Sequence, residues 1–503
     1  MNLTRQERWL LLGTVAVSAW LCLTMPVFAQ EAYYWSYAQY PDLSYFDHPP
    51  MVAWLIWLGT NVLGDGVVGL RLGTLLCGVG TGWLGLLWLR DLGCEPWVRA
   101  GWLVCSLAMP MLSATHFLTT PDPPLVFFWT LTLFCLWRAR DGKLGWWALA
   151  GVAAGAALLS KYAAAFLAVS GFLLLLADPA MRRQWRRPGP YLGVLLAAIT
   201  FLPVVAWNVG NDFESFRFQT EGRWSKAAIG VRWLGEFVGG QIGVIHPVIA
   251  LLIPVAAWWV GKKALRRDMP ATWLLATGLP MPLFFLANSL FIQVKINWLA
   301  PCFLPLAAIV MTWWSGTGRL QTHVRTTRVL TRVMLASVVL FAVAAPMIRW
   351  VPQSSGSSWS GWDEIAARAE YWEEQLDKRD GVEGNVFFFA SGYRDAAQLF
   401  RALKMHMYVM PADHDFEAVM AQNVFGETAL QFDHWEPTAS HIGQNAIYVL
   451  PRPDDRPREL EKLRRHFKSV QKLERVRTMK FGWCVAEADI YEAIEYRGPQ
   501  KSQ

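Results

Sequence analysis

Long apolar stretches alternate with short, mostly basic segments over the first 350 residues of the chain. A helix needs ~20 such residues to cross the hydrocarbon core of a membrane. The first of them, residues 9–29, follows Arg5 and Arg8 and resembles a cleavable signal peptide. Its length instead favours an uncleaved first helix with a cytoplasmic N-terminus. The pattern predicts a polytopic α-helical membrane protein.

Basic clusters between the apolar stretches predict the topology. They lie at Arg5 and Arg8, at Arg90, at Arg138, Arg140 and Lys143, at Arg182, Arg183, Arg186 and Arg187, at Lys262, Lys263, Arg266 and Arg267, and at Arg319, Arg325, Arg328 and Arg332. Cytoplasmic clusters require an even number of crossings between each neighbouring pair. Residues 145–177 must then hold two short crossings that turn at residues 160–162, because a single helix of that length would be about 50 Å long. With a last helix over residues 331–348 that leads to the outside, we expect about 11 spans.

The pattern changes after the last apolar stretch. Residues 351–361 include PQSSGSSWSG, which is typical of a linker. Residues 362–503 are richer in charge and alternate helical stretches with strand-like runs at 386–390 and 446–450. They predict a small soluble α/β domain, on the periplasmic side, after a transmembrane domain of residues 1–350.

Composition supports the membrane class and argues against a nucleic-acid partner. The chain is 54% hydrophobic and only 17% charged, against about 25% charged in soluble domains. The net charge of +7 arises from short clusters between apolar stretches, as the positive-inside rule expects. The 7 cysteines form no spacing framework, so neither a disulfide nor a zinc site is predicted.

An acidic and aromatic stretch, EAYYWSYAQYPDLSYFDHPPMVAW at residues 31–54, directly follows the first apolar segment. Aromatic rings favour the headgroup region of a membrane. Acids there are costly unless they face water, a metal or a polar substrate. The stretch therefore indicates either a functional site or an interfacial loop with solvated acids. A G-x-G-x-x-G match at residues 80–85 lies inside an apolar stretch, which indicates helix packing rather than dinucleotide binding.

The predicted topology brings polar residues from every outer turn to one membrane face. They are Glu31, Asp47 and His48 in the first turn, Asp122 in the second, Lys161 in the third, Asn208 in the fourth, and Lys295 with Asn297 in the fifth. A transporter more often holds its charges near the bilayer midplane. Groups gathered at one interface instead suit chemistry on a lipid-linked substrate. A carboxylate can take the proton of an acceptor hydroxyl, and basic side chains or a divalent cation can neutralise a departing phosphate.

Several short motifs in these turns resemble those of a known family. They are QEAYYW at 30–35, YFDHPP at 45–50, TPD at 120–122, SKY at 160–162, WN at 207–208 and KINW at 295–298. The set is similar to bacterial membrane glycosyltransferases related to protein O-mannosyltransferases, which include the aminoarabinose transferase that modifies lipid A. The resemblance covers roughly residues 9–315. It implies a C-type glycosyltransferase fold, a polyprenyl-phosphate sugar donor and a reaction at the periplasmic face of the inner membrane.

By this resemblance, Glu31 corresponds to the second residue of an Asp-Glu pair. The first acid of that pair is the usual base, and Gln30 stands in its place here. We therefore expect Asp47 or Glu31 to act as the base. Asp47 corresponds to an acid that helps to hold a metal in the lipid A enzyme, so Asp47 and Glu31 are also candidate ligands of a divalent cation. Asp122 corresponds to the family's acid in the second outer turn and is a further catalytic candidate. Lys161 corresponds to a residue that contacts the phosphate.

The remaining candidates are binding residues. We expect His48, which stands where the lipid A enzyme has a lysine, and Lys295 to contact the donor phosphate together with Lys161. Asn208, Tyr33 and Tyr34 are candidates for substrate contact. Structural roles are the alternative, because a histidine before two prolines can cap a helix and tyrosines can pack at the membrane interface.

The predicted function is that of an inverting glycosyltransferase. It would move a sugar from a polyprenyl-phosphate donor to a lipid or polysaccharide acceptor, such as lipid A, lipopolysaccharide or a protein, at the periplasmic face. Two alternatives stay open at this point. A flippase for lipid-linked sugars would use the same interface without chemistry, and a noncatalytic assembly partner would tolerate the loss of the loop acids.

Overall fold

The computed structural model describes most of the chain and divides it into two units. The described residues are 3–224, 229–351, 359–380, 386–409 and 419–499. The first unit, here called the membrane unit, comprises Met1–Leu23, Asp42–Val62 and Val68–Val343. The second, the α/β unit, comprises Thr24–Pro41, Leu63–Val67 and Ala344–Gln503. Of the predicted linker, residues 352–358 lie outside the described residues.

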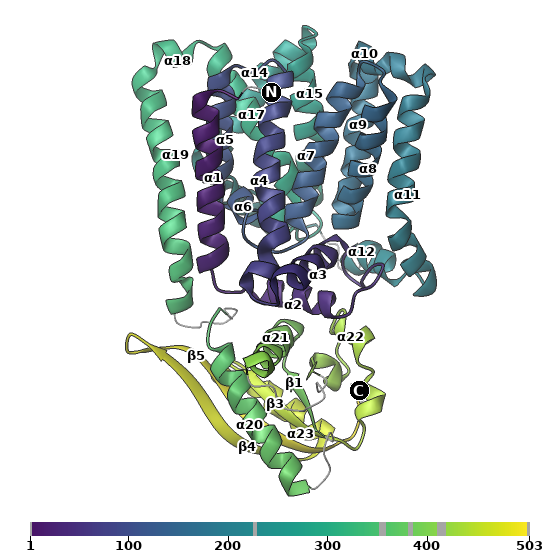
Figure 1. The fold of residues 1–503 in the computed structure, drawn as a ribbon, viewed down its shortest axis with the longest axis vertical. Coiled ribbons are helices and arrows are strands. Elements are labelled where there is room, and N and C mark those ends of the chain that lie inside the picture. Colours follow the sequence, from purple (N-terminus) through teal and green to yellow (C-terminus); the bar gives the residue numbers. More distant parts are fainter. Residues whose placement is uncertain (1–2, 225–228, 352–358, 381–385, 410–418, 500–503) are drawn as a thin grey trace. The chain divides into compact units, whose positions relative to one another are not determined.

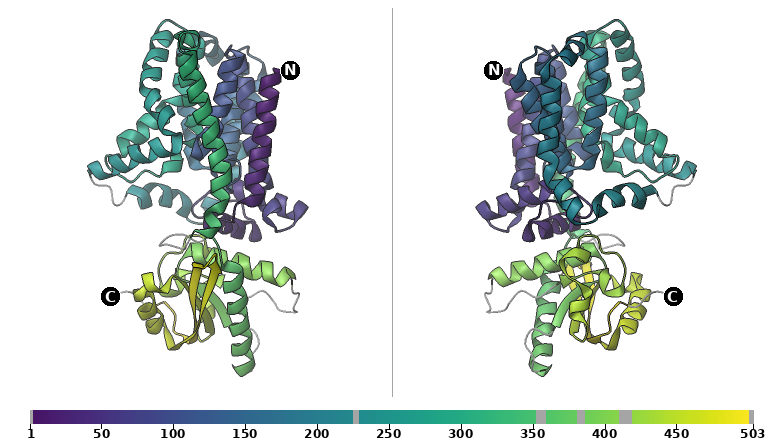
Figure 2. Two further views of the ribbon diagram at one scale, coloured as in Figure 1. Left: turned by 90° about the vertical axis from the view of Figure 1, so that its left-hand side faces the viewer. Right: turned by 90° about the vertical axis from the view of Figure 1, so that its right-hand side faces the viewer.

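The membrane unit is built from helices. Its helices are α1 (Arg5–Thr24), α3 (Met51–Leu63), α4 (Val67–Asp91), α5 (Pro96–Ala108), α6 (Pro110–Ala114), α7 (Asp122–Ala139), α8 (Leu144–Ser160), α9 (Phe166–Ala177), α10 (Pro179–Arg182), α11 (Pro188–Gly210), α12 (Glu214–Trp224), α13 (Val231–Ile245), α14 (Pro247–Leu265), α15 (Met269–Gly278), α16 (Pro280–Asn288), α17 (Ala300–Gly316), α18 (Arg319–Thr322) and α19 (Val324–Ala344). The long ones lie side by side in roughly one direction (Figures 1 and 2). Among the described residues, 6 helices are long and apolar enough to cross a membrane, or 8 if two bent pairs each form one span. The chain is a multi-pass membrane protein.

Glycines set the spacing of α8 and α11, which pack against each other. A Cβ atom on Gly151 would lie 2.2 Å from the Gly193 carbonyl oxygen of α11. One on Gly155, four residues later, would lie 2.5 Å from Thr200 Cβ. Small residues spaced in this way allow helices to approach closely in a membrane. The close approach of α8 and α11 therefore depends on the absence of side chains at these positions.

The helix α8 ends where the sequence predicts a turn. Lys161 has an extended backbone, with φ −163° and ψ 138°, and its N–H still donates to the Ala157 carbonyl. A 3-10 turn, Tyr162–Ala165, follows before α9 begins. The turn predicted at residues 160–162 is thus confirmed, and it carries the charge of Lys161 at the end of α8.

The glycines of the G-x-G-x-x-G match serve helix packing, as expected. A Cβ on Gly85 would lie 2.0 Å from the Trp102 ring of α5, and one on Gly80 would lie 2.6 Å from the Phe127 ring of α7. Both glycines make room for large aromatic side chains of neighbouring helices. The match is not a nucleotide-binding loop.

The α/β unit contains a five-stranded sheet in the order β2–β1–β3–β5–β4. Its elements are α2 (Ala29–Gln39), α20 (Trp362–Asp380), β1 (Val386–Ala390), α21 (Tyr393–Val409), β2 (Val419–Met420), α22 (Phe432–Trp435), β3 (Asn445–Pro451), α23 (Pro457–His466), β4 (Phe467–Lys480) and β5 (Trp483–Tyr496). The strand β1 is parallel to β2 and β3, whereas β5 is antiparallel to β3 and β4. The strand-like runs predicted at 386–390 and 446–450 lie in β1 and β3. The long strands β4 and β5 were not predicted.

Aromatic side chains fill the core of this unit. Phe387 and Phe389 of β1 pack with Tyr448 of β3, Tyr491 of β5 and Leu463 of α23. The helix α2 packs against α21. It belongs to this unit although it follows α1 in the sequence.

Candidate functional site

Asp122, Lys161 and Asn297 form a buried polar cluster in the membrane unit. The Lys161 ammonium donates to Asp122 Oδ1 at 2.7 Å, and Asn297 Nδ2 donates to Asp122 Oδ2 at 2.7 Å. The side chains of Lys161 and Asp122 are 9% and 3% exposed. Asp122 is the first residue of α7 and Lys161 follows α8, so the packing of these two helices brings the pair together. The contact confirms that two predicted outer turns meet.

An open cavity of about 790 Å³ lies beside this cluster. Its lining combines side chains that carry polar groups with apolar ones. The former are His48, Lys161, Tyr162, Gln219, Asn288 and Trp298, and the latter include Phe284, Phe285 and Ile292. A cationic side chain and apolar side chains therefore line one cavity. Such a cavity suits an amphipathic ligand that has an anionic group at one end.

Asp47 lies on the segment that precedes α3, next to this cavity. Its carboxylate is 8% exposed, and its Oδ2 atom lies 3.9 Å from His48 Nε2. Gln219 Nε2 of α12 donates to the Asp47 carbonyl at 2.8 Å and so ties the segment to the cavity wall. The carboxylate also interacts electrostatically with Tyr162. Asp47 is thus a buried acid at the edge of the cavity.

Two predicted binding residues of the membrane unit do not line this cavity. Asn208 is fully buried, and its side chain links two helices: Nδ2 donates to the Val204 carbonyl at 2.9 Å, and Oδ1 accepts from the Phe216 N–H at 3.3 Å. Its contacts hold α12 against the end of α11. Lys295 is exposed, and its ammonium lies 3.3 Å from Gln293 Oε1.

Glu31, Tyr33 and Tyr34 all belong to α2 of the α/β unit, and all are buried. Glu31 Oε2 accepts from the Phe28 N–H at 3.0 Å, which caps the first turn of the helix. The Tyr33 ring lies 4.9 Å from that of Tyr393, and its hydroxyl accepts from the backbone N–H of Gln431 at 3.2 Å. These contacts give Glu31 and Tyr33 a structural role inside the unit. The catalytic, metal-binding and substrate roles of the three residues stay predictions.

The residues predicted as metal ligands do not form a complete donor set by themselves. Within the described residues, no group of three or more His, Cys, Asp or Glu side chains is arranged to hold a metal ion. Asp47 and His48 are two neighbouring donors, whereas a catalytic metal such as zinc commonly has three protein ligands. Asp122 already has Lys161 as its cationic partner.

Two residues of this site received no role from the sequence. Asn297 was placed in the fifth outer turn and in the KINW motif without a role of its own, and Gln219 was not singled out at all. Asn297 contacts Asp122, which lies 175 positions earlier in the chain. Such pairings follow from the helix packing, which a single sequence does not specify residue by residue.

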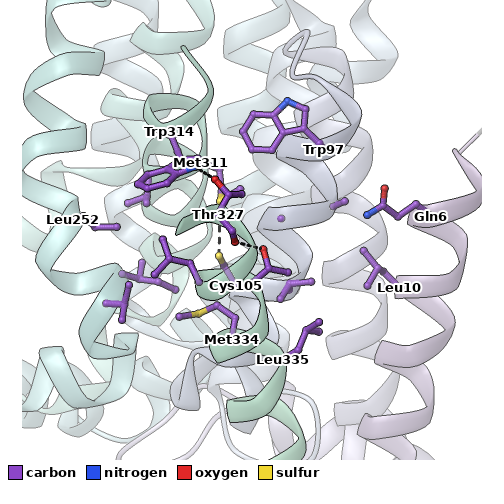
Figure 3. A pocket seen from close by; sticks show the side chains of 18 residues that line it. Gln6, Leu10, Trp97, Cys105, Leu252, Met311, Trp314, Thr327, Met334 and Leu335 are labelled. Atoms are coloured by element: carbon purple, nitrogen blue, oxygen red, sulfur yellow. Dashed lines mark hydrogen bonds between the residues drawn. The ribbon is translucent and has the colours of Figure 1, made fainter. Parts of the chain in front are cut away.

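A larger cavity, of about 1110 Å³, lies between α5, α14, α17 and α19 (Figure 3). Its walls are mostly apolar, with Trp97, Met311, Trp314 and Leu252 among the labelled side chains. Trp314 Nε1 donates to Thr327 Oγ1 at 3.0 Å. No acid, lysine, arginine or histidine lies among its lining residues in the described part of the chain. It offers space for an apolar chain but no acid–base chemistry, and we do not take it as the candidate site.

The fold of this chain has counterparts among known proteins. It is the fold of a C-type membrane glycosyltransferase. The structures of ArnT from Cupriavidus metallidurans in the apo state and bound to undecaprenyl phosphate have TM-scores of 0.64 and 0.62 with this chain. Both cover 98% of this chain and 99% of that protein at 16% sequence identity.

Sequence comparisons agree with this assignment. The family model described as dolichyl-phosphate-mannose-protein mannosyltransferase matches residues 47–207. The lipid A galacturonosyltransferase RgtD of Rhizobium johnstonii is 30% identical over 295 residues, which is 57% of this chain and 60% of that protein. The undecaprenyl phosphate-alpha-4-amino-4-deoxy-L-arabinose arabinosyl transferase of Pseudomonas paraeruginosa is 27% identical over 55% of this chain.

The matched regions span only 60% and 51% of the lengths of these two relatives. The match to the family model begins at Asp47 and includes Asp122 and Lys161. The predicted resemblance to membrane glycosyltransferases of this type is confirmed.

Proposed function

We propose that the protein is an inverting glycosyltransferase that moves a sugar from a polyprenyl-phosphate donor to a lipid or glycan acceptor. The observation that carries the proposal is a cavity lined both by Lys161, which Asp122 and Asn297 hold in place, and by the apolar side chains of Phe284 and Phe285. A polyprenyl phosphate presents the same combination, an anionic group joined to an apolar chain. The relatives named for lipid A and for undecaprenyl phosphate support this class of donor and acceptor.

The proposed reaction is a single displacement at the anomeric carbon of the sugar. The acceptor oxygen forms a bond to this carbon on the face opposite the phosphate, and the carbon–oxygen bond to the phosphate breaks. The bonding electrons leave with the polyprenyl phosphate, and the acceptor proton moves to a carboxylate base. Attack from the opposite face inverts the configuration. The phosphate leaves readily, so no acid is required to protonate it.

Asp47 is the base that we favour in this scheme. Its carboxylate is buried beside the cavity, whereas both carboxylate oxygens of Asp122 already accept hydrogen bonds, from Lys161 and from Asn297. We assign Asp122 the task of holding Lys161, which would neutralise the charge that develops on the phosphate. His48 lines the same cavity and would add a second contact to the phosphate.

A divalent cation is a further part of the proposal, with Asp47 and Glu31 as the expected carboxylate ligands. A bound cation would neutralise negative charge on the phosphate. Because Asp47 and His48 supply fewer donors than a complete site needs, no step of the reaction is assigned to the metal. Activity that survives removal of divalent cations by a chelator would contradict this part.

We also propose the placement of the chain in a bacterial inner membrane. The basic clusters support about 11 spans with a cytoplasmic N-terminus. The cavity and a soluble α/β domain of residues 362–503 would then face the periplasm. This placement gives the enzyme access to lipid-linked donors and to acceptors that mature outside the cytoplasm.

The first experiment combines the purified protein with a panel of polyprenyl-phosphate sugars and a membrane-lipid extract. Mass spectrometry would follow free polyprenyl phosphate and the mass of one sugar added to an acceptor. We expect Asp47→Asn to lower turnover about 10²–10⁴-fold, the usual contribution of a general base. Asp212→Asn is the matched control, because Asp212 is an exposed outer-turn acid whose positive φ of 49° suits asparagine.

Three outcomes decide between the classes. Release of polyprenyl phosphate by the wild type and by Asp212→Asn, but not by Asp47→Asn, supports the proposal. Normal turnover by a folded Asp47→Asn variant would contradict the assignment of the base. Movement of an intact sugar donor across the bilayer, with no cleavage of any donor in the panel, would favour the flippase.

A further inference from the structure

A second polar cavity lies wholly within the α/β unit, at the carboxyl ends of its central parallel strands. Ser391 directly follows β1 and Arg452 directly follows β3, and both line a cavity of about 890 Å³. Gly392, Tyr393, Arg394, Asp395, Arg456 and Glu459 complete its lining. None of these residues takes part in the glycosyl transfer proposed above.

The cavity lies where the chain leaves β1 and β3 toward opposite faces of the sheet. The helix that follows β3, α23, covers the face that carries Tyr491. The neighbouring residue on β5, Glu492, accepts from Arg379 of α20 at 2.9 and 3.0 Å, so α20 covers the other face. The helix that follows β1, α21, packs against α20. A position where successive helices diverge in this way is the usual ligand-binding crevice of an open α/β sheet.

Positive charge dominates this crevice, because three arginines and two carboxylates line it. Arg456 donates to Asp395 Oδ2 at 2.7 Å, and Lys462 donates to Glu459 Oε1 at 3.0 Å. Both carboxylates therefore have a cationic partner already. Arg394 and Arg452 add two further guanidinium groups, which are suited to a planar contact with an anion.

The backbone around the crevice supports the same charge preference. The helix α21 begins at Tyr393, so the N–H groups of its first turn lie at the crevice. A helix N-terminus attracts anions through these groups and through the helix dipole. Arg452 is only 8% exposed and has a positive φ of 52°, and its N–H donates to the Glu487 carbonyl at 3.0 Å. This hydrogen bond to β5 thus fixes the backbone of the buried arginine.

The hydroxyl of Tyr448 lies next to the lining of the crevice. Tyr448 is fully buried and interacts with the Ser391 side chain, and also with Glu459, Arg456 and Asp395, all of which line the crevice. Burial raises the pKa of this phenol well above its usual value, so it stays a neutral O–H donor. The crevice thus has a neutral donor beside its arginines.

We propose that this crevice binds a phosphate group. Arg394 and Arg452 would contact its oxygens, with the first N–H groups of α21 and the Tyr448 hydroxyl as further donors. A phosphate matches the surplus of donors better than a carboxylate, because it has more acceptor oxygens and a charge near −2. Its source is either a soluble phosphate or the head group of a phosphorylated lipid, and the experiment below separates the two. The proposal does not depend on the glycosyltransferase assignment, since the crevice lies in the α/β unit.

The test uses the full-length protein with inorganic phosphate as the soluble probe. The lipid probe is a nanodisc of phosphatidylcholine with phosphatidic acid, compared with one of phosphatidylcholine alone. Hydrogen–deuterium exchange of peptides that cover residues 391–396 and 452–459 reports on the crevice. We expect protection that saturates with the probe, and an affinity at least tenfold lower in Arg394→Gln. Arg394 is exposed, so this variant should fold.

Two further variants make the result specific. Tyr448→Phe removes only the hydroxyl and should weaken binding severalfold. Arg465→Gln is the control, because Arg465 is an exposed arginine that pairs with Glu461 elsewhere on α23. Protection by inorganic phosphate would support a soluble ligand, and protection only by phosphatidic acid would support a lipid head group. Absence of protection by both probes, or equal affinity in Arg394→Gln and Arg465→Gln, would overturn the proposal.

Discussion

Lys161 joins a structural contact and a proposed functional role in one side chain. It is nearly buried and pairs with Asp122, yet it also lines the cavity that we assign to the donor phosphate. Loss of activity after its removal would therefore be ambiguous. A pair of substitutions can separate the two roles, because the structural part depends on charge balance with Asp122 alone.

We expect Lys161→Met to lower the free energy of unfolding by about 3–5 kcal/mol, because it leaves the buried Asp122 carboxylate without its cation. The double variant Lys161→Met with Asp122→Asn should recover most of this loss, since both groups are then neutral. Its turnover should stay low, because no cation remains for the phosphate. Thermal unfolding in detergent measures the stability, and the release of polyprenyl phosphate measures the turnover. Full activity of the double variant would contradict the phosphate role of Lys161.

His441 is a pH-sensitive residue of the α/β unit. Its Nε2 lies 3.6 Å from Glu436 Oε2, and this interaction raises the pKa of the imidazole above its usual 6.5. A raised pKa in the folded state stabilises the fold fully below pH 6.5, and the contribution is lost as the pH rises through the folded pKa. We expect hydrogen exchange in β3 to become faster across this range. Glu436→Gln should remove the extra pH dependence, and an unchanged pH profile in that variant would contradict the assignment.

Among the elements, the packing of α8 against α11 positions the helix that Lys161 follows. We expect Gly151→Ala to destabilise the membrane unit by about 1–3 kcal/mol, because the added methyl group meets the Gly193 carbonyl at 2.2 Å. Turnover should fall as well, since α8 carries Lys161. Gly145→Ala is the matched control in the same helix, because a Cβ atom added there would have no neighbouring atom within 4 Å. Equal unfolding midpoints for the two variants would contradict the packing argument.

Charge patterns predicted some elements well and others poorly. The lone lysine in a long apolar stretch placed the break after α8 correctly, because a charge is costly inside a membrane. The strand β4 was not predicted, since its sequence FKSVQKLERVRTMK is rich in charged residues that favour helices. The packing of α2 against α21 was not predicted either, because aromatic residues indicate burial without naming the partner. The contact between Asp122 and Asn297 was not predicted either, because placement at one membrane face does not specify which polar residues pair.

At the scale of the whole molecule, the proposed orientation of the chain rests on its charge distribution. The cluster at Arg182, Arg183, Arg186 and Arg187 lies between α9 and α11. Positive residues in a short connection strongly favour the cytoplasmic side. An odd number of spans would then place the α/β unit on the other side of the membrane, which is the side that the proposed reaction requires.

Cysteine labelling tests this orientation directly. The native thiols are buried except for the half-buried Cys94 and Cys484. Replacing these two by serine therefore leaves only buried native thiols, which should not react with the label. In that background, a membrane-impermeant maleimide should label Lys480→Cys in intact spheroplasts, because Lys480 is exposed on β4 of the α/β unit. The exposed Arg186→Cys should react only after lysis. If Arg186→Cys reacted first, the cavity and its acids would face the cytoplasm, and a reaction with periplasmic acceptors would be excluded.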